Sequence, residues 1–233
     1  DSWEEVLKLN QLSILAHNEI GRNLFSQGNY EESMYHFELA GSRYMYSQSY
    51  WEVRNVQIQQ NLPFFLIAVI ALVIVWQVVK LTNRKYAYLD VPTQKVQQFL
   101  KKKPIDDVLF TFYFFKHPID GFYYLKRKVR GSYYGATILF AIFFVIYLNN
   151  VMNKGFIFQF VEASDMDLGA IVIGFFALFT LFIFSNYLVT SINDGEGTIG
   201  EIYRGVMYSL APLMISYILT WALSFYVTYN EII

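Results

Sequence analysis

Residues 62–79 read LPFFLIAVIALVIVWQVV, a run without a single charged residue. An α-helix rises about 1.5 Å per residue, so about 20 apolar residues cross the ~30 Å hydrocarbon core of a bilayer. The run therefore predicts a transmembrane helix. Pro63 is expected near the beginning of that helix, where the missing N–H of a proline costs little because the first helical N–H groups have no intrahelical partner.

Three further runs of similar length and composition follow, at about 133–152, 168–190 and 205–229. The aromatic residues that suit a membrane–water interface gather near several expected ends: Trp76, Tyr133, Tyr134, Tyr147, Tyr226 and Tyr229. The alternative is a very hydrophobic soluble helical bundle, but such a bundle does not require four separate apolar segments long enough to cross a bilayer. We therefore predict an all-α, multi-pass transmembrane protein, in keeping with the 55% hydrophobic and 19% aromatic content of the chain.

Lysine and arginine are concentrated between the first two predicted spans. Residues 80–130 contain twelve of them against four aspartates, whereas residues 1–61 contain four basic and eight acidic residues. Loops rich in Lys and Arg stay in the cytoplasm. We therefore place the 80–132 loop in the cytoplasm of a cell-membrane protein, and residues 1–61 and 153–167 outside. Alternation of the spans then makes the loop 191–204 cytoplasmic, although the charge of that loop does not argue for it.

Four parts are expected along the chain. They are an extracytoplasmic helical segment, a first transmembrane helix, a basic cytoplasmic segment of amphipathic helices, and a three-span membrane domain, at 1–61, 62–79, 80–132 and 133–233. The sequence begins at Asp1 without a methionine and ends just past a hydrophobic run. We therefore expect further chain at both ends.

The extracytoplasmic segment contains LAHNEIGRNLFSQGNYEESMYHFELAGSRYMYS at residues 15–47. A helix, a Gly-Asn-Tyr turn and a second helix are expected, with small residues where the two helices touch (Gly21, Ser33, Ala40) and large ones between them (Ile20, Leu24, Tyr30, Phe37). This pattern resembles one tetratricopeptide repeat (TPR), with His17 in place of the usual aromatic residue. Because such folds need about three repeats, the resemblance implies that upstream repeats or another protein cover this TPR-like hairpin. A plain αα-hairpin stalk is the alternative.

Three short helices are expected in the basic segment. TQKVQQFLKKK (93–103) is polar and basic, and IDDVLFTFYFFK (105–116) is aromatic on nearly every side, so it must be buried in protein or in the membrane interface. In PIDGFYYLKRKVRG (118–131) the apolar residues share one face, and the basic residues Lys126, Arg127, Lys128 and Arg130 crowd the other. That pattern predicts an amphipathic helix lying on the inner leaflet, attracted to anionic lipids by about 1 kcal/mol per charge. The alternative is ordinary positive-inside anchoring.

The stretch SINDGEGTIGEIYRGVMYSLAPLM (191–214) joins the last two predicted spans. Gly195 and Gly197 permit backbone angles that other residues avoid. Thr198 followed by Glu201 is a capping box that begins a short helix, 199–208, along the inner face. Pro212, with Ser209 and Ala211 beside it, is expected to kink the span that follows. Most of this pattern indicates a rigid connector, and docking of a partner such as an ATPase subunit is the other interpretation.

Two stretches together resemble a known family. HPIDGFYYLKRKVRGSYYGATILF (117–140) carries a proline, an aromatic residue four positions on, a basic stretch and Gly-Ser entering a span. SNYLVTSINDGEGTIGEIYRGVMYSLAPLM (185–214) carries the glycine turn, Tyr208 and Pro212. The chain over 105–233 is similar to the membrane domain of the Ypt-interacting-protein (YIP) family in its bacterial form. That domain usually has five spans, so the resemblance implies two more beyond the three counted here.

The resemblance also implies a role. Eukaryotic relatives bind small GTPases and shape vesicle traffic, and some bacterial relatives resemble components encoded beside carbohydrate ABC importers. We therefore expect a non-enzymatic accessory or scaffold subunit that contacts integral membrane partners, such as ABC permease subunits, through its inner face: Gly195, Gly197, Glu201, Arg204, Phe112 and Phe115. An extracytoplasmic protein or domain at the TPR-like hairpin and anionic lipids are further expected partners. The alternatives are a stand-alone transporter or channel, and a membrane enzyme with catalytic residues elsewhere.

The residues themselves point to no catalysis, cofactor or metal. There is no cysteine, and His17, His36 and His117 lack metal-ligand spacing. EASDMD (162–167) offers carboxylates but lacks the glycine and the length of a calcium loop, so it is interpreted as the acidic start of the third span. The predicted spans contain no ionisable residue at their centres, which disfavours an ion-coupled transporter. The basic residues lie beside lipid and form no known nucleic-acid module, so no nucleic-acid partner is expected.

Overall fold

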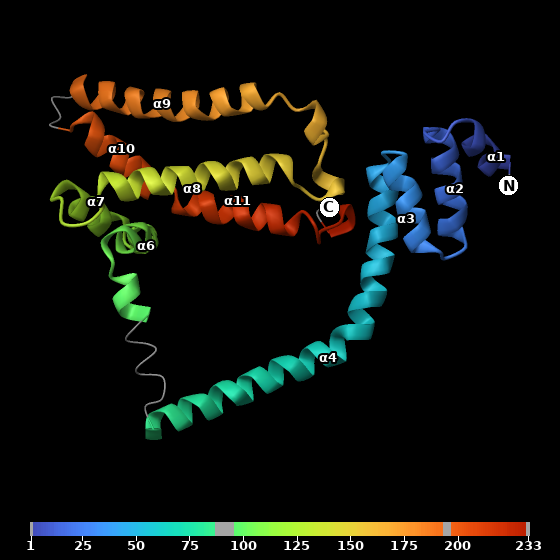
Figure 1. Ribbon diagram of the computed structural model, residues 1–233, viewed down its shortest axis with the longest axis horizontal. Helices are drawn as coiled ribbons and strands as arrows, with labels where there is room; N and C mark the ends of the chain where they lie inside the picture. Colours follow the sequence, from blue (N-terminus) through green and yellow to red (C-terminus); the bar gives the residue numbers. More distant parts are fainter. Residues whose placement is uncertain (1, 87–95, 193–196, 232–233) are drawn as a thin grey trace. The chain divides into compact units, whose positions relative to one another are not determined.

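The computed structural model describes residues 2–86, 96–192 and 197–231, and in these ranges every regular element is a helix (Figure 1). The chain forms two compact units. One contains residues 1–88, 155–160 and 223–233, and the other contains residues 89–154 and 161–222. The first unit therefore gathers three segments that are far apart in the sequence. The predicted boundaries between parts remain predictions.

The first unit begins with α1 (Ser2–Leu9) and the hairpin of α2 (Ile14–Ser26) and α3 (Tyr30–Leu39). Gly28 has a φ of 80°, so it ends α2 in the left-handed conformation that glycine adopts freely. Gly21 lies against the fully buried Phe37 ring: a Cβ on Gly21 would be 2.8 Å from Phe37 Cε1. The small–large contact expected between the two helices is therefore present. The likeness to a TPR stays a prediction.

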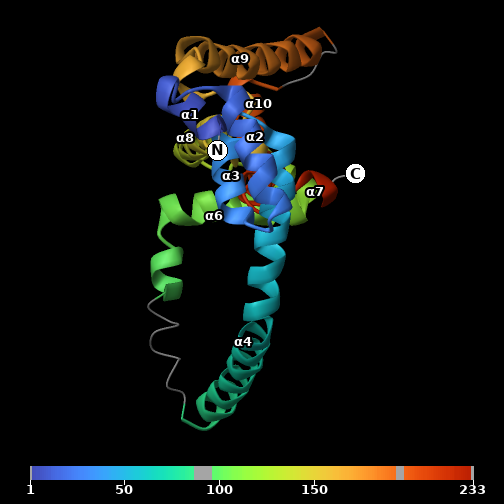
Figure 2. The ribbon, with the colours of Figure 1, turned by 90° about the vertical axis from the view of Figure 1, so that its right-hand side faces the viewer.

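Helix α4 (Arg43–Tyr86) is one continuous helix of 44 residues. The prediction that Pro63 stands at a helix beginning is wrong, because α4 starts twenty residues earlier and runs through it. The N-terminal half of α4 is helical because it packs on α3, and Ser33 Oγ lies 2.8 Å from Ser49 Oγ across that contact. α2, α3 and the start of α4 lie side by side in both views (Figures 1 and 2). Figure 1 also shows α4 changing direction along its length, as expected of a helix with an internal proline.

Two later segments pack on the N-terminal half of α4. Near η1 (Phe156–Phe158), Gln159 O accepts hydrogen bonds from Arg43 Nε at 3.1 Å and Nη2 at 2.7 Å. At η3 (Tyr229–Glu231), the Glu231 carboxylate accepts hydrogen bonds from Arg54 at 2.6 and 2.9 Å. The Arg54 guanidinium lowers the pKa of Glu231 to about 2. These contacts join both segments to the N-terminal unit.

The second unit holds α6 (Lys103–Lys116), α7 (Pro118–Lys126), α8 (Tyr133–Met152), η2 (Ala163–Asp165), α9 (Leu168–Ile192), α10 (Ile199–Tyr208) and most of α11 (Ala211–Leu223). Together with α4, the helices α8, α9 and α10–α11 are long and apolar enough to cross a membrane. The prediction of four spans is confirmed at this level, and α8 has the predicted bounds. The molecule is a multi-pass, all-helical membrane protein.

The last predicted span is not one helix. α10 ends at Tyr208, α11 begins at Ala211, and Pro212 lies in the first turn of α11. The predicted span at about 205–229 therefore corresponds to a candidate span from Ile199 to Ser224 that is interrupted between α10 and α11, because a proline fits a first turn better than a helix interior. The expected kink takes the form of a break between two helices. α11 ends at Leu223, well before the predicted end.

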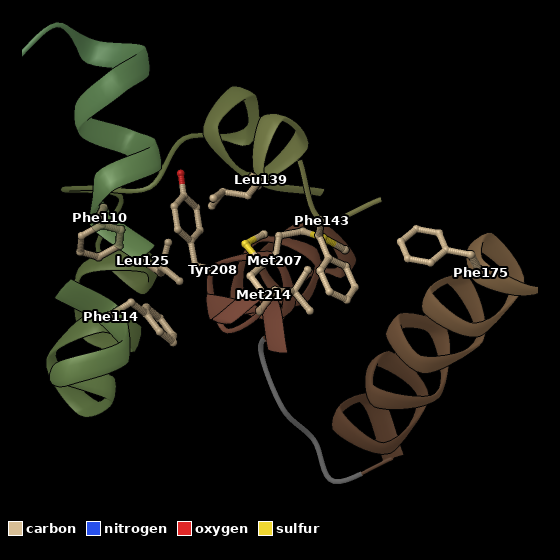
Figure 3. Packing of buried hydrophobic residues seen from close by; sticks show 11 residues of the cluster. Phe110, Phe114, Leu125, Leu139, Phe143, Phe175, Met207, Tyr208 and Met214 are labelled. Atoms are coloured by element: carbon tan, nitrogen blue, oxygen red, sulfur yellow. The ribbon is translucent and has the colours of Figure 1, made fainter. Parts of the chain in front are cut away.

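The core of this unit is aromatic, with Phe110, Leu139, Met207 and Tyr208 almost fully buried (Figure 3). The Tyr208 ring meets the Phe110 ring edge-on at 5.4 Å between centroids. α9 joins this core mainly through long aromatic side chains, of which Phe175 is the buried one. α6 buries one face in this core and leaves Phe112 and Phe115 exposed on the other.

Candidate functional site

A pocket of about 730 Å³ lies between α7, α9 and α10 in the second unit. Its lining is Phe122, Leu125, Lys126, Lys128, Phe182, Asn186, Thr190, Gly197, Glu201, Ile202, Arg204, Gly205, Val206 and Ser209. Ligand pockets in proteins have volumes of about 300–1,000 Å³. The pocket is therefore large enough for a small molecule or a lipid headgroup, and it contains several residues that the sequence singled out.

Thr198 and Glu201 set the start of α10 at the edge of this pocket. Thr198 Oγ1 accepts a hydrogen bond from Glu201 N at 3.3 Å, and Glu201 Oε2 accepts one from Thr198 N at 3.1 Å. The predicted capping box and the predicted bounds of the helix, 199–208, are both confirmed. Gly197 lies just before this start, and its small size matters there, since a Cβ on Gly197 would lie 3.2 Å from Thr190 Cγ2.

Arg204 is the buried charge of the site, with 3% of its surface exposed. Its Nη1 donates a hydrogen bond to Gly131 O at 3.2 Å, and its guanidinium carbon lies 4.7 Å from the centre of the Tyr133 ring. Nε and Nη2 are buried and have no hydrogen-bond partner in the part of the chain that the structure describes. A buried charge without a counter-ion is costly. Arg204 is therefore the residue of this site that most needs a functional explanation.

A close helix contact places Arg204 at this depth. Gly205 follows it in α10, and a Cβ on Gly205 would lie 3.2 Å from Phe122 Cε1 of α7. α7 and α10 therefore pack closely at Gly205, where the missing side chain leaves room for Phe122. Neither the depth of Arg204 nor this contact could be read from the spacing of residues in the sequence.

The four residues of the basic cluster, Lys126, Arg127, Lys128 and Arg130, have different surroundings in the structure. α7 ends at Lys126, so Arg127, Lys128 and Arg130 lie in the turn after the helix and not on its polar face as predicted. Lys126 and Lys128 line the pocket. Arg130 instead pairs with Asp106 at 2.5 Å. The predicted amphipathic helix is thus shorter than expected, because the turn from α7 into α8 begins within the basic run.

Arg127 takes neither of these roles. Its guanidinium carbon lies 4.6 Å from the centre of the Tyr123 ring, and its side chain is exposed and does not line the pocket. Arg127 therefore carries the same charge as its neighbours in a different place, which makes it a useful reference position.

The remaining predicted contact residues lie apart from the pocket. Phe112 and Phe115 are on the exposed side of α6, with 51% and 50% of their surfaces accessible. Gly195 lies outside the described residues. The structure thus brings Gly197, Glu201 and Arg204 together with two of the four basic residues, and leaves both phenylalanines elsewhere. That any of these residues contacts a partner stays a prediction.

The contribution of α9 to the pocket was not predicted from the sequence. Phe182, Asn186 and Thr190 are spaced four residues apart, so they lie along one face of the end of α9. The signal in the sequence was this spacing of four residues, together with the change from an apolar to polar residues toward the end of the predicted span 168–190.

Tyr208 and Asp107 form a second polar cluster beneath α10, with a structural role. Tyr208 donates a hydrogen bond to Ser132 O at 3.2 Å, and Thr111 donates one to Tyr208 O at 2.9 Å. Asp107 accepts a hydrogen bond from the Ser132 hydroxyl, which also caps α8. Asp107 is therefore a buried hydrogen-bond acceptor. The cluster joins α6, α8 and α10.

The described residues contain no group of three His, Cys, Asp or Glu side chains placed to hold a metal ion. One histidine pair is close: His17 Nδ1 and His36 Nδ1 lie 2.9 Å apart, so one donates and the other accepts. Burial, and then the neighbouring His17, lower the pKa of His36. The pair joins α2 to α3, and no described carboxylate lies with it in a group that could hold a metal ion.

The comparisons with known proteins give one match. The family described as the Yip1 domain matches residues 112–232, just over half of the chain. No curated protein and no solved structure matches the chain. The match covers α7 to α11 and the last five residues of α6, and therefore all of the residues that line the pocket.

Proposed function

The chain belongs to the Yip1 family, and from this premise we propose that it is a non-enzymatic accessory or scaffold subunit that binds another integral membrane protein. The observation that supports the proposal is the residue composition and aromatic packing of its membrane-spanning helices. α8, α9 and α11 contain no Asp, Glu, Lys, Arg or His, and the two charged residues of the fourth candidate span, Glu201 and Arg204, lie in α10 at its beginning. Aromatic rings pack between α8 and α9: Phe140, Phe143, Phe144, Phe175, Phe176 and Phe179. Transport paths in membrane proteins are marked by intramembrane ionisable residues, so contact with a partner suits these spans better than transport.

The partner that we propose is the permease of a carbohydrate ABC importer, as the family resemblance implies. The inner-face contact would include Gly195, Gly197, Glu201 and Arg204. Phe112 and Phe115 support it, because half-exposed aromatic side chains on one helix face are the residue type that dominates protein interfaces. The other helix face of α6 is already buried in the unit.

The extracytoplasmic hairpin is proposed to bind a second protein or an upstream domain. Leu12, Ile14 and Leu15 support this, since 82%, 61% and 60% of their surfaces are exposed at the start of α2. A cluster of three large aliphatic residues at one helix end is more apolar than the scattered single residues of ordinary surfaces. The hairpin is therefore the natural contact on that side.

The test is affinity purification of the full-length protein in a mild detergent, with mass spectrometry of the bound proteins. Stoichiometric recovery of ABC permease and ATPase subunits is expected. The double variant Phe112→Ala/Phe115→Ala should lower that recovery at least tenfold, the effect of one interface hot spot. Ile119→Ala is the matched control, because Ile119 is 85% exposed on α7 and is not in the proposed contact.

Two results would contradict the proposal. Recovery of the protein alone, as a discrete homo-oligomer, would favour the alternative of a stand-alone transporter or channel, which flux assays in vesicles would then examine. Equal losses for the double variant and for Ile119→Ala would show that α6 is not the contact.

A further inference from the structure

We propose that the pocket between α7, α9 and α10 binds a phosphate group, with Arg204, Lys126 and Lys128 as its cationic partners. The proposal does not require a permease partner, although Gly197, Glu201 and Arg204 belong both to this pocket and to the contact proposed above. The phosphate can come from an anionic phospholipid or from a soluble phosphate compound, and the lining of the pocket favours the lipid.

The guanidinium of Arg204 offers the edge that phosphate recognition uses. Nη1 is engaged by Gly131 O, whereas Nε and Nη2 have no partner in the described residues. These two nitrogens form the side-on edge of a guanidinium, whose parallel N–H groups bind phosphate oxygens in pairs. Both nitrogens are covered by neighbouring atoms, so a bound phosphate must displace part of the lining to reach them.

The charges around the pocket favour an anion. Among the described residues, Arg204, Lys126 and Lys128 line it together with one carboxylate, Glu201. That carboxylate is already engaged as the acceptor for Thr198 N in the capping box. No ion pair of 4 Å or less joins Arg204 to a described carboxylate. The described residues that line the pocket therefore carry two positive charges in excess, and the charge of Arg204 lies at low dielectric, where its field is least screened.

The rest of the lining favours a ligand with an apolar part. Phe122, Phe182, Ile202 and Val206 supply apolar surface, and Asn186 and Thr190 add polar atoms where α9 ends. Phe182 is 53% exposed on a helix that is long and apolar enough to cross the membrane. A phosphate ion alone is far smaller than 730 Å³. A phospholipid headgroup, with its glycerol and the start of its acyl chains along Phe182, matches both the volume and the mixed lining.

The experiment measures lipid retention by the full-length protein with native mass spectrometry. The protein is exchanged into detergent containing either phosphatidylglycerol or phosphatidylcholine at equal mole fraction, at physiological ionic strength. We expect selective retention of phosphatidylglycerol. The double variant Lys126→Gln/Lys128→Gln should reduce that retention about tenfold, since each lost charge-assisted contact weakens binding several-fold. Both lysines are exposed, so this variant is expected to fold normally.

Two further variants separate a pocket from general surface attraction. Arg127→Gln removes one positive charge from the same turn but not from the pocket, and it should change retention less than twofold. Arg204→Lys keeps the charge but loses the paired N–H edge, and it should lower retention as Arg204→Gln does. Equal losses for Arg127→Gln and Lys128→Gln would overturn the proposal, because they would show attraction to the surface only.

A competition arm identifies the source of the phosphate. Inorganic phosphate and glycerol 3-phosphate are added to the protein with bound phosphatidylglycerol. Little displacement at millimolar concentration supports a lipid. Displacement by either compound at micromolar concentration supports the phosphate site with a soluble ligand. No selectivity of phosphatidylglycerol over phosphatidylcholine, together with no binding of either soluble compound, would overturn the proposal.

Discussion

Replacing Gly21 with alanine sets two opposing effects against each other in the α2–α3 hairpin. Alanine in place of glycine inside a helix normally adds about 1 kcal/mol of stability. Here the new Cβ would lie 2.8, 2.9 and 3.1 Å from the Phe37 ring atoms Cε1, Cδ1 and Cζ. Phe37 is fully buried, so the ring cannot turn outward to make room. Such overpacking costs about 1–3 kcal/mol, so we expect a net loss of about 1 kcal/mol.

Hydrogen exchange of residues 14–39 in the detergent-solubilised full chain measures this loss locally. A loss of 1 kcal/mol corresponds to about fivefold faster exchange in the protected core of the hairpin. Phe37→Leu removes the ring atoms Cε1 and Cζ, so Gly21→Ala should cost clearly less when the two substitutions are combined. Slower exchange in Gly21→Ala alone would refute the close contact, because the gain in helix propensity would then act without opposition.

Three other outcomes are expected. Thr198→Ala should destabilise α10 by about 1 kcal/mol through loss of its cap, and Thr198→Ser should restore most of it, as hydrogen exchange of residues 199–208 would show. Burial and the neighbouring His17 lower the pKa of His36 below its ordinary value of 6.5. The unfolded hairpin therefore binds more protons at this residue than the folded one, and hairpin stability should fall as the pH drops below about 6.5. His36→Gln should flatten this pH dependence in melting curves. The contact of Glu231 with Arg54 should be complete above pH 4.5 and be lost as the pH falls toward about 2, and Glu231→Gln should remove this transition from acid unfolding curves.

The features that the sequence predicted correctly are local. α8 is bounded by an apolar run and by Ser132, which caps its first turn. The start of α10 depends on two residues three positions apart, Thr198 and Glu201. Hydropathy and capping act within one or two helical turns, so they can be read directly from neighbouring residues.

The features that were wrong or missed depend on distant contacts. α4 begins early because its first half packs on α3, which no local signal around Pro63 reveals. Arg204 is buried because Gly131 and Tyr133 come to it from another part of the chain. Arg130 leaves the basic cluster because Asp106 lies beside it in space. Tertiary contacts of this kind have no short-range pattern.

The hydrogen bonds between Arg54 and Glu231 have a consequence for biosynthesis. The two residues are 177 positions apart, and a ribosome adds about 5–20 residues per second. Arg54 therefore emerges roughly 10–35 s before its partner exists. The segment of the chain that forms the second unit is made entirely within that interval. The helices α8 to α10 and most of α11 can therefore fold before residues 223–233, the last segment of the first unit, have been synthesised. The order of synthesis thus allows the second unit to fold before the first unit is complete.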